Sequence, residues 1–301
     1  TFVAEDTHLP GNPLCVVKQL MPINEYGQPV PKSSSSYQIA QRLFYTEVKV
    51  LYKLGEHNQI PRLFAHFEEN QEFYLVQEFI AGDILQEVIN RQQWNENQVI
   101  DLLEDILTPL AFVHQHQVIH RDLKPDNLIR RKHDNKIVLI DFGAVKENMS
   151  IAVSSQNRSV GIGTPGYMPN EQFNGQPTLS SDVYAVGLIA IQALTGLHPI
   201  QLSNDPNTKE IAWRNYAKVS LKLAEILDKM VRYDSRQRYQ SASEALELVR
   251  SLQNQQKKTI NPKLIGILLI LLLTIIVGAV ILIRSNIQPP NKPAKEEIPA
   301  F

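Results

Sequence analysis

The sequence predicts an α+β chain with two lobes and one transmembrane helix. We expect a small, mostly-β lobe with a single helix at 1–80, a larger, mostly-α lobe at 81–252, and a span at 264–283. Three observations lead to this fold class. Strand-like apolar runs dominate the first 80 residues, and from residue 96 onward apolar residues recur at helical spacing. The run at 264–283 carries no charge.

The first 80 residues contain four strand-like runs and one helical run. We expect the strands at 1–6, 14–20, 63–67 and 73–79. The helix is expected over 38–55, where apolar residues stand three or four positions apart, namely Leu43, Phe44, Val48, Leu51 and Leu54. The chain begins with Thr1 rather than Met, and we expect further residues upstream of it.

The larger lobe is expected to be helical with short strands. A polar loop at 120–127 is followed by strands around 128–129 and 137–140, and residues 144–165 show no period. The apolar patterns predict four helices, over Glu96–His114, Val183–Leu194, Leu221–Val231 and Ser241–Leu252.

Composition excludes several classes of protein. Hydrophobic residues make up 43% of the 301 residues, which is enough to bury a core and excludes a disordered or fibrous chain. The 30 basic and 31 acidic residues give a net charge of −1, so we expect no nucleic-acid partner. The single cysteine, Cys15, excludes an intrachain disulfide framework and a Cys-cluster metal site.

Two acidic motifs carry the chemistry. Asp122 stands five residues before Asn127 in the segment HRDLKPDN, so the loop can point both side chains at one site. There Asp122 can accept a proton from an attacking hydroxyl, and Asn127 can ligate a metal ion. Asp141 follows the apolar run KIVLI by one position, a place suited to holding Mg²⁺ on nucleotide phosphates.

These motifs, HRDLKPDN followed by DFG at 141–143, resemble the catalytic and metal-binding loops of the protein kinase family. The phrases IDFGAVKE and GTPGYMPNEQ look most like bacterial Ser/Thr kinases of the eukaryotic type. The resemblance covers about residues 1–252. It implies a bilobal fold with ATP and Mg²⁺ as cofactors, and Ser/Thr residues of proteins as acceptors.

The family's nucleotide-binding residues can be matched one by one. Lys18, in the strand CVVK, resembles the lysine that contacts the α- and β-phosphates, and Glu47 on the following helix resembles its ion-pair partner. The segment after the strand at 73–79 resembles the hinge between the lobes, so Gln77 should border the back pocket. The backbones of Glu78 and Ile80 should contact adenine.

The substrate-binding and structural residues follow from the same resemblance. Lys124 is typical of Ser/Thr kinases, and its ammonium can stabilise the transferring phosphoryl group. Thr164 resembles the threonine that touches both Asp122 and Lys124. Three further residues are expected to be structural, namely Glu171 paired with a buried Arg238, and Asp182 bonded to the backbone of the catalytic loop.

The resemblance also implies regulation through an activation segment. Arg121 directly precedes the catalytic aspartate, and in the family such an arginine often meets a phosphate on that segment. The candidate acceptors are Ser150, Ser154, Ser155, Ser159 and Thr164, although any one of these could simply be a solvated loop residue. A homodimer that phosphorylates itself in trans is a further expectation.

The apolar run from Leu264 to Ile283 is 20 residues long and, as a helix, would span about 30 Å, the thickness of a bilayer core. A buried core helix is the alternative, but it would normally show a polar stripe. Four basic residues precede the run within 15 positions and three follow, which leaves its orientation nearly undecided. Because ATP is cytoplasmic, we expect a single-pass protein of the cell membrane with its kinase domain in the cytoplasm. A linker at 253–263 would lead into the span, and a disordered tail at 284–301 would lie outside.

Three functions remain open on the sequence. The first is a membrane-anchored Ser/Thr protein kinase, which the intact catalytic residues favour. The second is a membrane-tethered pseudokinase or scaffold. It is favoured because residues 1–13 contain only Gly11, so the Gly-rich loop over the phosphates is missing and is expected upstream of Thr1. The third is a small-molecule phosphotransferase, against which the segment at 163–171 argues because it resembles a platform for protein substrates.

Overall fold

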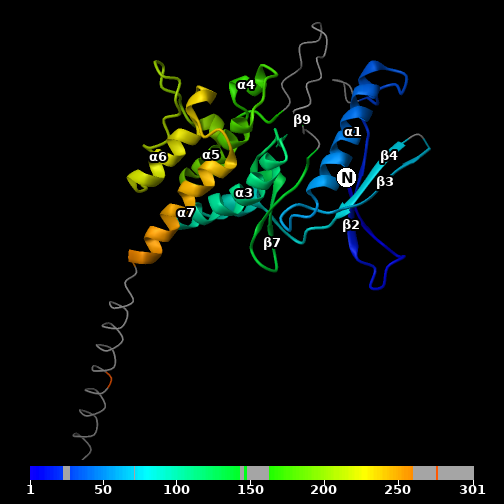
Figure 1. The fold of residues 1–301 in the computed structure, drawn as a ribbon, viewed down its shortest axis with the longest axis horizontal. Coiled ribbons are helices and arrows are strands. Elements are labelled where there is room, and N and C mark those ends of the chain that lie inside the picture. Colours follow the sequence, from blue (N-terminus) through cyan, green and yellow to red (C-terminus); the bar gives the residue numbers. More distant parts are fainter. Residues whose placement is uncertain (23–27, 71, 143–145, 148–162, 260–275, 277–301) are drawn as a thin grey trace, which may run out of the picture. The chain divides into compact units, whose positions relative to one another are not determined.

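The computed structural model describes residues 1–22, 28–70, 72–142, 146–147, 163–259 and 276. The chain divides into two compact units, Thr1–Leu252 and Gln253–Phe301. The first unit holds a sheet-rich small lobe and a larger helical lobe (Figure 1). The α+β, bilobal arrangement expected from the sequence is therefore confirmed.

The small lobe is an antiparallel sheet with one helix. Its strands stand in the order β1-β2-β4-β3. They run over β1 Phe2–Glu5, β2 Leu14–Gln19, β3 Leu63–Glu69 and β4 Glu72–Glu78. The register pairs Lys18 of β2 with Leu75 of β4. This pairing places Lys18 in the middle of the sheet rather than at its edge.

Helix α1, Ser35–Leu54, follows the apolar stripe that the sequence shows and begins three residues earlier than expected. Ser34 caps it, because the Ser34 side chain accepts a hydrogen bond from the Tyr37 amide. The buried face of α1 packs on β4, where the rings of Phe44 and Phe73 have centroids 5.7 Å apart. Glu47 belongs to this buried face and is only 9% exposed.

The larger lobe is built from helices and short hairpins. Its helices are α2 Leu85–Arg91, α3 Glu96–Gln115, α4 Asn170–Phe173, α5 Leu179–Thr195, α6 Leu221–Met230 and α7 Ala242–Thr259. Short 3₁₀ turns are η1 Pro125–Asn127, η2 Pro199–Gln201 and η3 Ser235–Gln237. Strands β5 Gly82–Ile84, β7 Leu128–Arg131 and β8 Ile137–Leu139 form one small sheet, and β6 Val118–Ile119 pairs with β9 Lys146–Glu147.

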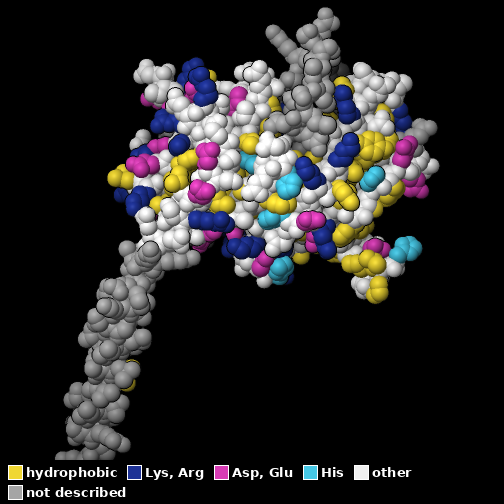
Figure 2. Space-filling model, viewed as in Figure 1, with side chains coloured by type: hydrophobic (Ala, Val, Ile, Leu, Met, Phe, Trp, Pro, Cys, Tyr) yellow, Lys and Arg dark blue, Asp and Glu magenta, His cyan; other side chains and the backbone are white. Residues whose placement is uncertain are grey.

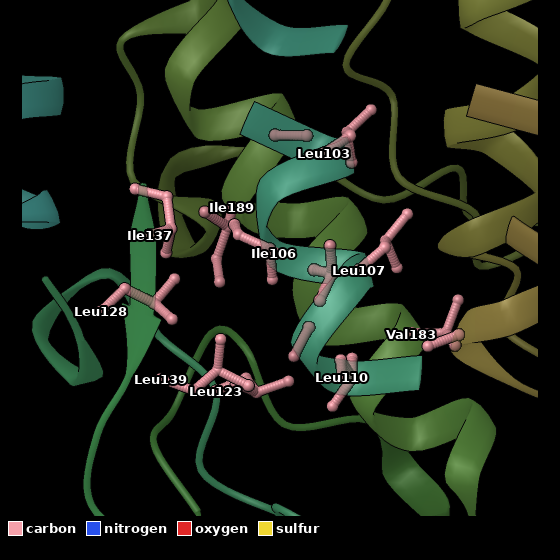
Figure 3. Packing of buried hydrophobic residues seen from close by; sticks show 14 of the residues in the cluster. Leu103, Ile106, Leu107, Leu110, Leu123, Leu128, Ile137, Leu139, Val183 and Ile189 are labelled. Atoms are coloured by element: carbon pink, nitrogen blue, oxygen red, sulfur yellow. The ribbon is translucent and has the colours of Figure 1, made fainter. Parts of the chain in front are cut away.

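Helix α3 lies at the centre of the core (Figure 3). Its apolar stripe is broad, and Leu103, Ile106, Leu107 and Leu110 are fully buried between α5 and β8. On α5, a side chain at Gly187 would bring its Cβ within 2.7 Å of Val231, so α5 and the end of α6 approach too closely for any larger residue. This packing holds the loop that follows α3 and β6 against the core.

Some elements depart from the expectation. Strand β5 and helix α2 occupy residues for which the sequence analysis specified no element, because both are short and carry no sustained apolar period. Helix α7 continues past Leu252 to Thr259, so the first part of the predicted linker is helical.

The predicted span at 264–283, apart from Ile276, and the tail at 284–301 lie outside the described residues. Within the part of the chain that is described, no helix combines the length and the apolar character needed to cross a membrane. On the face drawn in Figure 2, basic and acidic side chains are interspersed. This mixture agrees with the net charge of −1.

Candidate active site

The loop at 120–124 is fixed by hydrogen bonds to one buried carboxylate. Asp182 of α5 is 1% exposed, and it accepts hydrogen bonds from the backbone amides of His120 (2.8 Å) and Arg121 (2.9 Å). Arg121 has a φ of 70°, a left-handed conformation that a residue with a side chain adopts only when its surroundings impose it. Asp182 therefore lies where the sequence analysis places it, beneath the loop that carries Asp122.

His114 of α3 is a residue of this site that sequence reasoning missed. Its Nδ1 accepts a hydrogen bond from the Ala242 amide (3.0 Å), so the ring proton stands on Nε2 and is donated to Asp182 (3.1 Å). His114 thereby joins the start of α7 to the carboxylate that holds the catalytic loop. A histidine inside an amphipathic helix gives no sequence signal for such a contact.

Asp122 lies at the centre of a compact polar cluster. Its Oδ1 accepts a hydrogen bond from the Thr164 hydroxyl (2.7 Å), and its Oδ2 accepts one from Asn127 Nδ2 (3.0 Å). Lys124 Nζ lies 3.2 Å from Asp122 Oδ2 and donates to Thr164 Oγ1 (2.8 Å). The side chains of Asp122 and Lys124 are 19% and 23% exposed, so a substrate can still reach them.

The Thr164 hydroxyl is the link that orients both Asp122 and Lys124. Replacing Thr164 by alanine is expected to lower kcat by about tenfold, because one hydrogen bond to each charged group is lost. Thr164→Ser keeps the hydroxyl and should retain most of the rate. Steady-state kinetics of the two variants check this, and equal rates for Ala and Ser would contradict it.

Lys18 joins the two lobes. Its Nζ lies 3.1 Å from Glu47 Oε1 of α1 and 3.0 Å from Asp141 Oδ1, which follows β8. Burial alone would lower the pKa of Lys18, but the two carboxylates outweigh it and raise the pKa above its ordinary value. The ammonium therefore stays charged at neutral pH and can serve a phosphate group.

Replacing Lys18 by methionine removes this ammonium but keeps most of the side-chain volume. We expect kcat/KM for ATP to fall about ten- to hundredfold, the range of one lost charge-assisted hydrogen bond. Steady-state kinetics with varied ATP measure the effect. Lys32→Met is the matched control, because among the described residues the hydrogen bond of the Lys32 ammonium goes to the Asn70 carbonyl on the exposed surface. An equal loss in both variants would contradict a specific role of Lys18.

Asp141 and Asn127 supply oxygen ligands of the kind that Mg²⁺ prefers. Asn127 donates through Nδ2 to the Asp122 carbonyl (2.7 Å) as well as to its carboxylate, which leaves the amide oxygen as the acceptor end. The Asp141 side chain is 49% exposed. Among the described residues no group of three or more His, Cys, Asp or Glu is placed to hold a metal by itself. This donor set fits an ion that is shared with substrate phosphates.

Phe142 fixes the position of Asp141. It is 1% exposed, and its ring packs on His120 with the centroids 4.8 Å apart. His120 Nε2 lies 3.2 Å from the Ile140 carbonyl, so the residues on both sides of Asp141 are tied to the catalytic loop. Asp141 itself has a φ of 65°, which turns its side chain out of the strand direction.

The predicted hinge connects β4 to β5. Gln77 is 5% exposed and Ile80 is 8% exposed. The Glu78 amide donates to the Arg62 carbonyl (2.9 Å), and the Glu78 carboxylate lies 3.4 Å from Arg62 Nε. The Ala81 carbonyl accepts from the Lys132 amide (2.8 Å), which ties this segment to the large lobe. The adenine contacts of Glu78 and Ile80 stay predictions.

Glu171 and the buried Arg238 form a partly buried ion pair at the end of the segment that carries Thr164. Arg238 Nη1 lies 2.6 Å from Glu171 Oε1, Nη2 lies 3.2 Å from Oε2, and the Arg238 side chain is only 1% exposed. The Ser181 hydroxyl also donates to Glu171 (2.7 Å). Next to Glu171, Gln172 donates to the Arg121 carbonyl (2.5 Å), a second contact that the sequence analysis did not foresee.

Arg121 itself is 8% exposed, and burial lowers the pKa of its guanidinium while Asp182 opposes this effect. Of the proposed phosphate acceptors, only Thr164 belongs to the described residues. The other four acceptors lie outside them, namely Ser150, Ser154, Ser155 and Ser159.

Comparison with known proteins agrees with this geometry. A model of the protein kinase domain matches residues 29–258, a match that begins after Lys18. The serine/threonine-protein kinase PknA of Nostoc sp. is 46% identical over 82% of this chain and 44% of its own length. Serine/threonine-protein kinases C and B of Synechocystis sp. are 45% and 41% identical over 81% and 82% of this chain, and 45% and 43% of their own lengths.

The chain spans less than half the length of these curated relatives. They are bacterial Ser/Thr kinases by name, as the motifs at 120–127 and 141–143 predict, and the matched model covers most of the chain. The chain belongs to the protein kinase family.

Proposed function

We propose that this chain is a membrane-anchored Ser/Thr protein kinase that transfers the γ-phosphoryl group of ATP to hydroxyl groups of proteins, itself included. The observation that carries the proposal is the convergence on one site of Asp122, Lys124 and Asn127 with the Lys18–Glu47–Asp141 ion-pair cluster. Asp122, Lys124 and Asn127 come from one loop, whereas Lys18, Glu47 and Asp141 come from β2, α1 and the residues after β8. A module that only binds nucleotide would need the second group but not Asp122 and Lys124.

The chain's own residues divide the work of phosphoryl transfer. Lys18 binds and orients the phosphates, and Glu47 holds the ammonium in place. Asp122 orients the acceptor hydroxyl and accepts its proton as the oxygen–phosphorus bond forms and the bond from the γ-phosphorus to the β–γ bridging oxygen breaks. Lys124 neutralises charge that develops on the transferring group. Most of the rate acceleration then comes from positioning and electrostatics.

Asp141 and Asn127 would hold Mg²⁺, which when bound neutralises phosphate charge. The preference for Ser and Thr acceptors rests on Lys124 and on Thr164, which bridges it to Asp122. It is also supported by the names of the relatives, which are Ser/Thr kinases.

The direct test is incubation of the purified chain with Mg²⁺, γ-labelled ATP and a generic acceptor protein, followed by phosphoamino-acid analysis. We expect label on Ser or Thr in the chain and in the acceptor, and its loss when Mg²⁺ is chelated. Label on tyrosine alone would contradict the proposed acceptor class. ATP binding with no transfer under any condition would favour the membrane-tethered pseudokinase.

The membrane part of the proposal rests on the uncharged run at 264–283. The kinase domain would lie in the cytoplasm, where ATP is available, and the 284–301 tail outside. In inside-out vesicles we expect protease to digest the kinase domain. Protection of the kinase domain in those vesicles would contradict this orientation.

Regulation by phosphorylation is the final part of the proposal. A phosphate on Ser159 or a neighbouring hydroxyl would face Arg121 and order the segment before Thr164, and a transient homodimer would supply it in trans. Mass spectrometry of the active protein is expected to find phosphate between residues 143 and 171. Fully active protein without phosphate in this segment would contradict regulation by phosphorylation.

A further inference from the structure

The loop between α1 and β3, residues 55–62, bonds the small lobe to the large lobe. The Gln59 side chain makes two of these bonds. Gln59 is 6% exposed, and its Nε2 donates to two backbone carbonyls, that of Asp105 in α3 (3.0 Å) and that of Ile137 in β8 (2.7 Å). The backbone carbonyl of Gln59 accepts a hydrogen bond from the Leu139 amide (3.0 Å).

Gln59 thus forms hydrogen bonds with the free edge of β8, much as a neighbouring strand would. The Gln59 backbone and side chain bond both ends of this three-residue strand, and the far side of β8 pairs with β7. Figure 3 shows Ile137 of β8 pointing toward Ile106 of α3, and these two elements are in contact. The position of β8 relative to α3 is therefore set at the point where Gln59 bonds both.

Strand β8 leads directly to Asp141. Leu139 is the last residue of β8, Ile140 donates to the Asn127 carbonyl (3.0 Å), and Asp141 follows. On the other side, loop 55–62 begins where α1 ends, and α1 carries Glu47. Gln59 therefore ties together the two elements whose carboxylates meet again on Lys18.

Replacement of Gln59 leaves other contacts between the loop and the large lobe in place. Arg131 Nη1 of β7 donates to the Asn58 carbonyl (2.6 Å), and the ring of His57 packs on Phe112 of α3 with centroids 5.1 Å apart. These contacts touch α3 and β7, whereas Gln59 alone in this loop bonds β8 among the described hydrogen bonds. The expected result of losing Gln59 is a shift of β8 and Asp141 rather than unfolding of the lobe.

We propose that Gln59 is a positioning residue for ATP, which sets the spacing between Glu47 and Asp141 around Lys18 by bonding β8 to the loop that ends α1. The predicted effect of Gln59 on the rate rests on the proposed kinase function. Its predicted effect on nucleotide affinity can be measured without turnover. Gln59 touches no substrate and acts only through these carboxylates.

The test compares Gln59→Met and Gln59→Glu with the wild type. Methionine keeps the length without a donor, and glutamate keeps the shape but presents acceptors to the two carbonyls. For both we expect Mg²⁺-dependent ATP affinity to weaken about tenfold and kcat to fall by a similar factor, since small displacements at a reacting centre are costly. The KM for the acceptor protein should not change.

Gln93→Met is the control for loss of a hydrogen bond from a glutamine to a backbone carbonyl. Gln93 is exposed, and it donates to the Leu194 carbonyl within the large lobe. We expect this variant to bind ATP and turn over as the wild type does. Equal losses in Gln93→Met and Gln59→Met would overturn the proposal, as would unchanged ATP affinity in a cooperatively folded Gln59→Met.

A double-mutant cycle separates positioning from general stability. In a Glu47→Gln background the Lys18 ion pair is already weakened, so adding Gln59→Met should cost much less ATP affinity than it does in the wild type. Fully additive losses would show that Gln59 acts independently of Glu47 and would overturn the mechanism. If the wild type transfers no phosphate, the kinase proposal fails, and the ATP affinities still decide the role of Gln59.

Discussion

Replacing Asp122 by asparagine is expected to reduce phosphoryl transfer by about 10²–10⁴-fold, the range for removal of a general base. Asparagine has nearly the same shape, so the fold and the Thr164 contact should survive, but its amide cannot take the proton of the acceptor hydroxyl. Affinity for ATP should stay close to that of the wild type, because Lys18 and Asp141 remain in place.

Steady-state kinetics and a nucleotide-binding measurement on the same preparation check this expectation. Asp126→Asn is the matched control, because Asp126 lies on the same loop in η1 but makes no contact with the Asp122 cluster among the described hydrogen bonds. A rate for Asp122→Asn within a few-fold of the wild type would contradict the assignment of Asp122 as the base.

Replacing Arg238 by methionine is expected to lower the free energy of unfolding by about 3–5 kcal/mol, because it leaves Glu171, whose side chain is only 16% exposed, without its cationic partner. Arg238 also donates to the carbonyls of Arg232 (2.6 Å) and Tyr233 (3.0 Å), which lose their donors as well. This loss is a large share of the about 5–15 kcal/mol that stabilises a typical domain. The segment that carries Thr164 should become easier to unfold.

Urea denaturation of the folded chain measures this loss. Arg250→Met is the matched control, since Arg250 pairs with Glu104 (3.0 Å) while half exposed, and such a pair contributes only about 0–1 kcal/mol. Similar losses in the two variants would contradict the claim that burial gives the Glu171–Arg238 pair its importance.

Much of the small lobe could be predicted from local pattern. The stripe that contains Phe44, Val48 and Leu51 defines both the existence of α1 and the face it buries, and Glu47 falls on that face. The same is true of β2, where Lys18 sits in an otherwise apolar run. In both cases one charged residue interrupts an apolar pattern, and that interruption is a signal that a single sequence can carry.

The contacts of His114 and Gln59 could not be predicted in this way. Gln59 bonds backbone carbonyls 46 and 78 positions away, those of Asp105 and Ile137. His114 bonds the Ala242 amide 128 positions away as well as the Asp182 carboxylate. Backbone groups leave no mark in a sequence, so such contacts cannot be read from it. Strand β5 and helix α2 were missed for a related reason, since pairing with β7 rather than local propensity defines β5.

Single-turnover transfer is the sharpest test of whether Asp122 serves as the base of an active kinase. The chain is first saturated with Mg²⁺ and γ-labelled ATP, and transfer to Ser or Thr is then followed for the wild type and for Asp122→Asn at equal nucleotide occupancy. We predict transfer by the wild type and almost none by Asp122→Asn. Nucleotide bound equally by both, with transfer by neither, would contradict an active kinase and leave a nucleotide-binding module in its place.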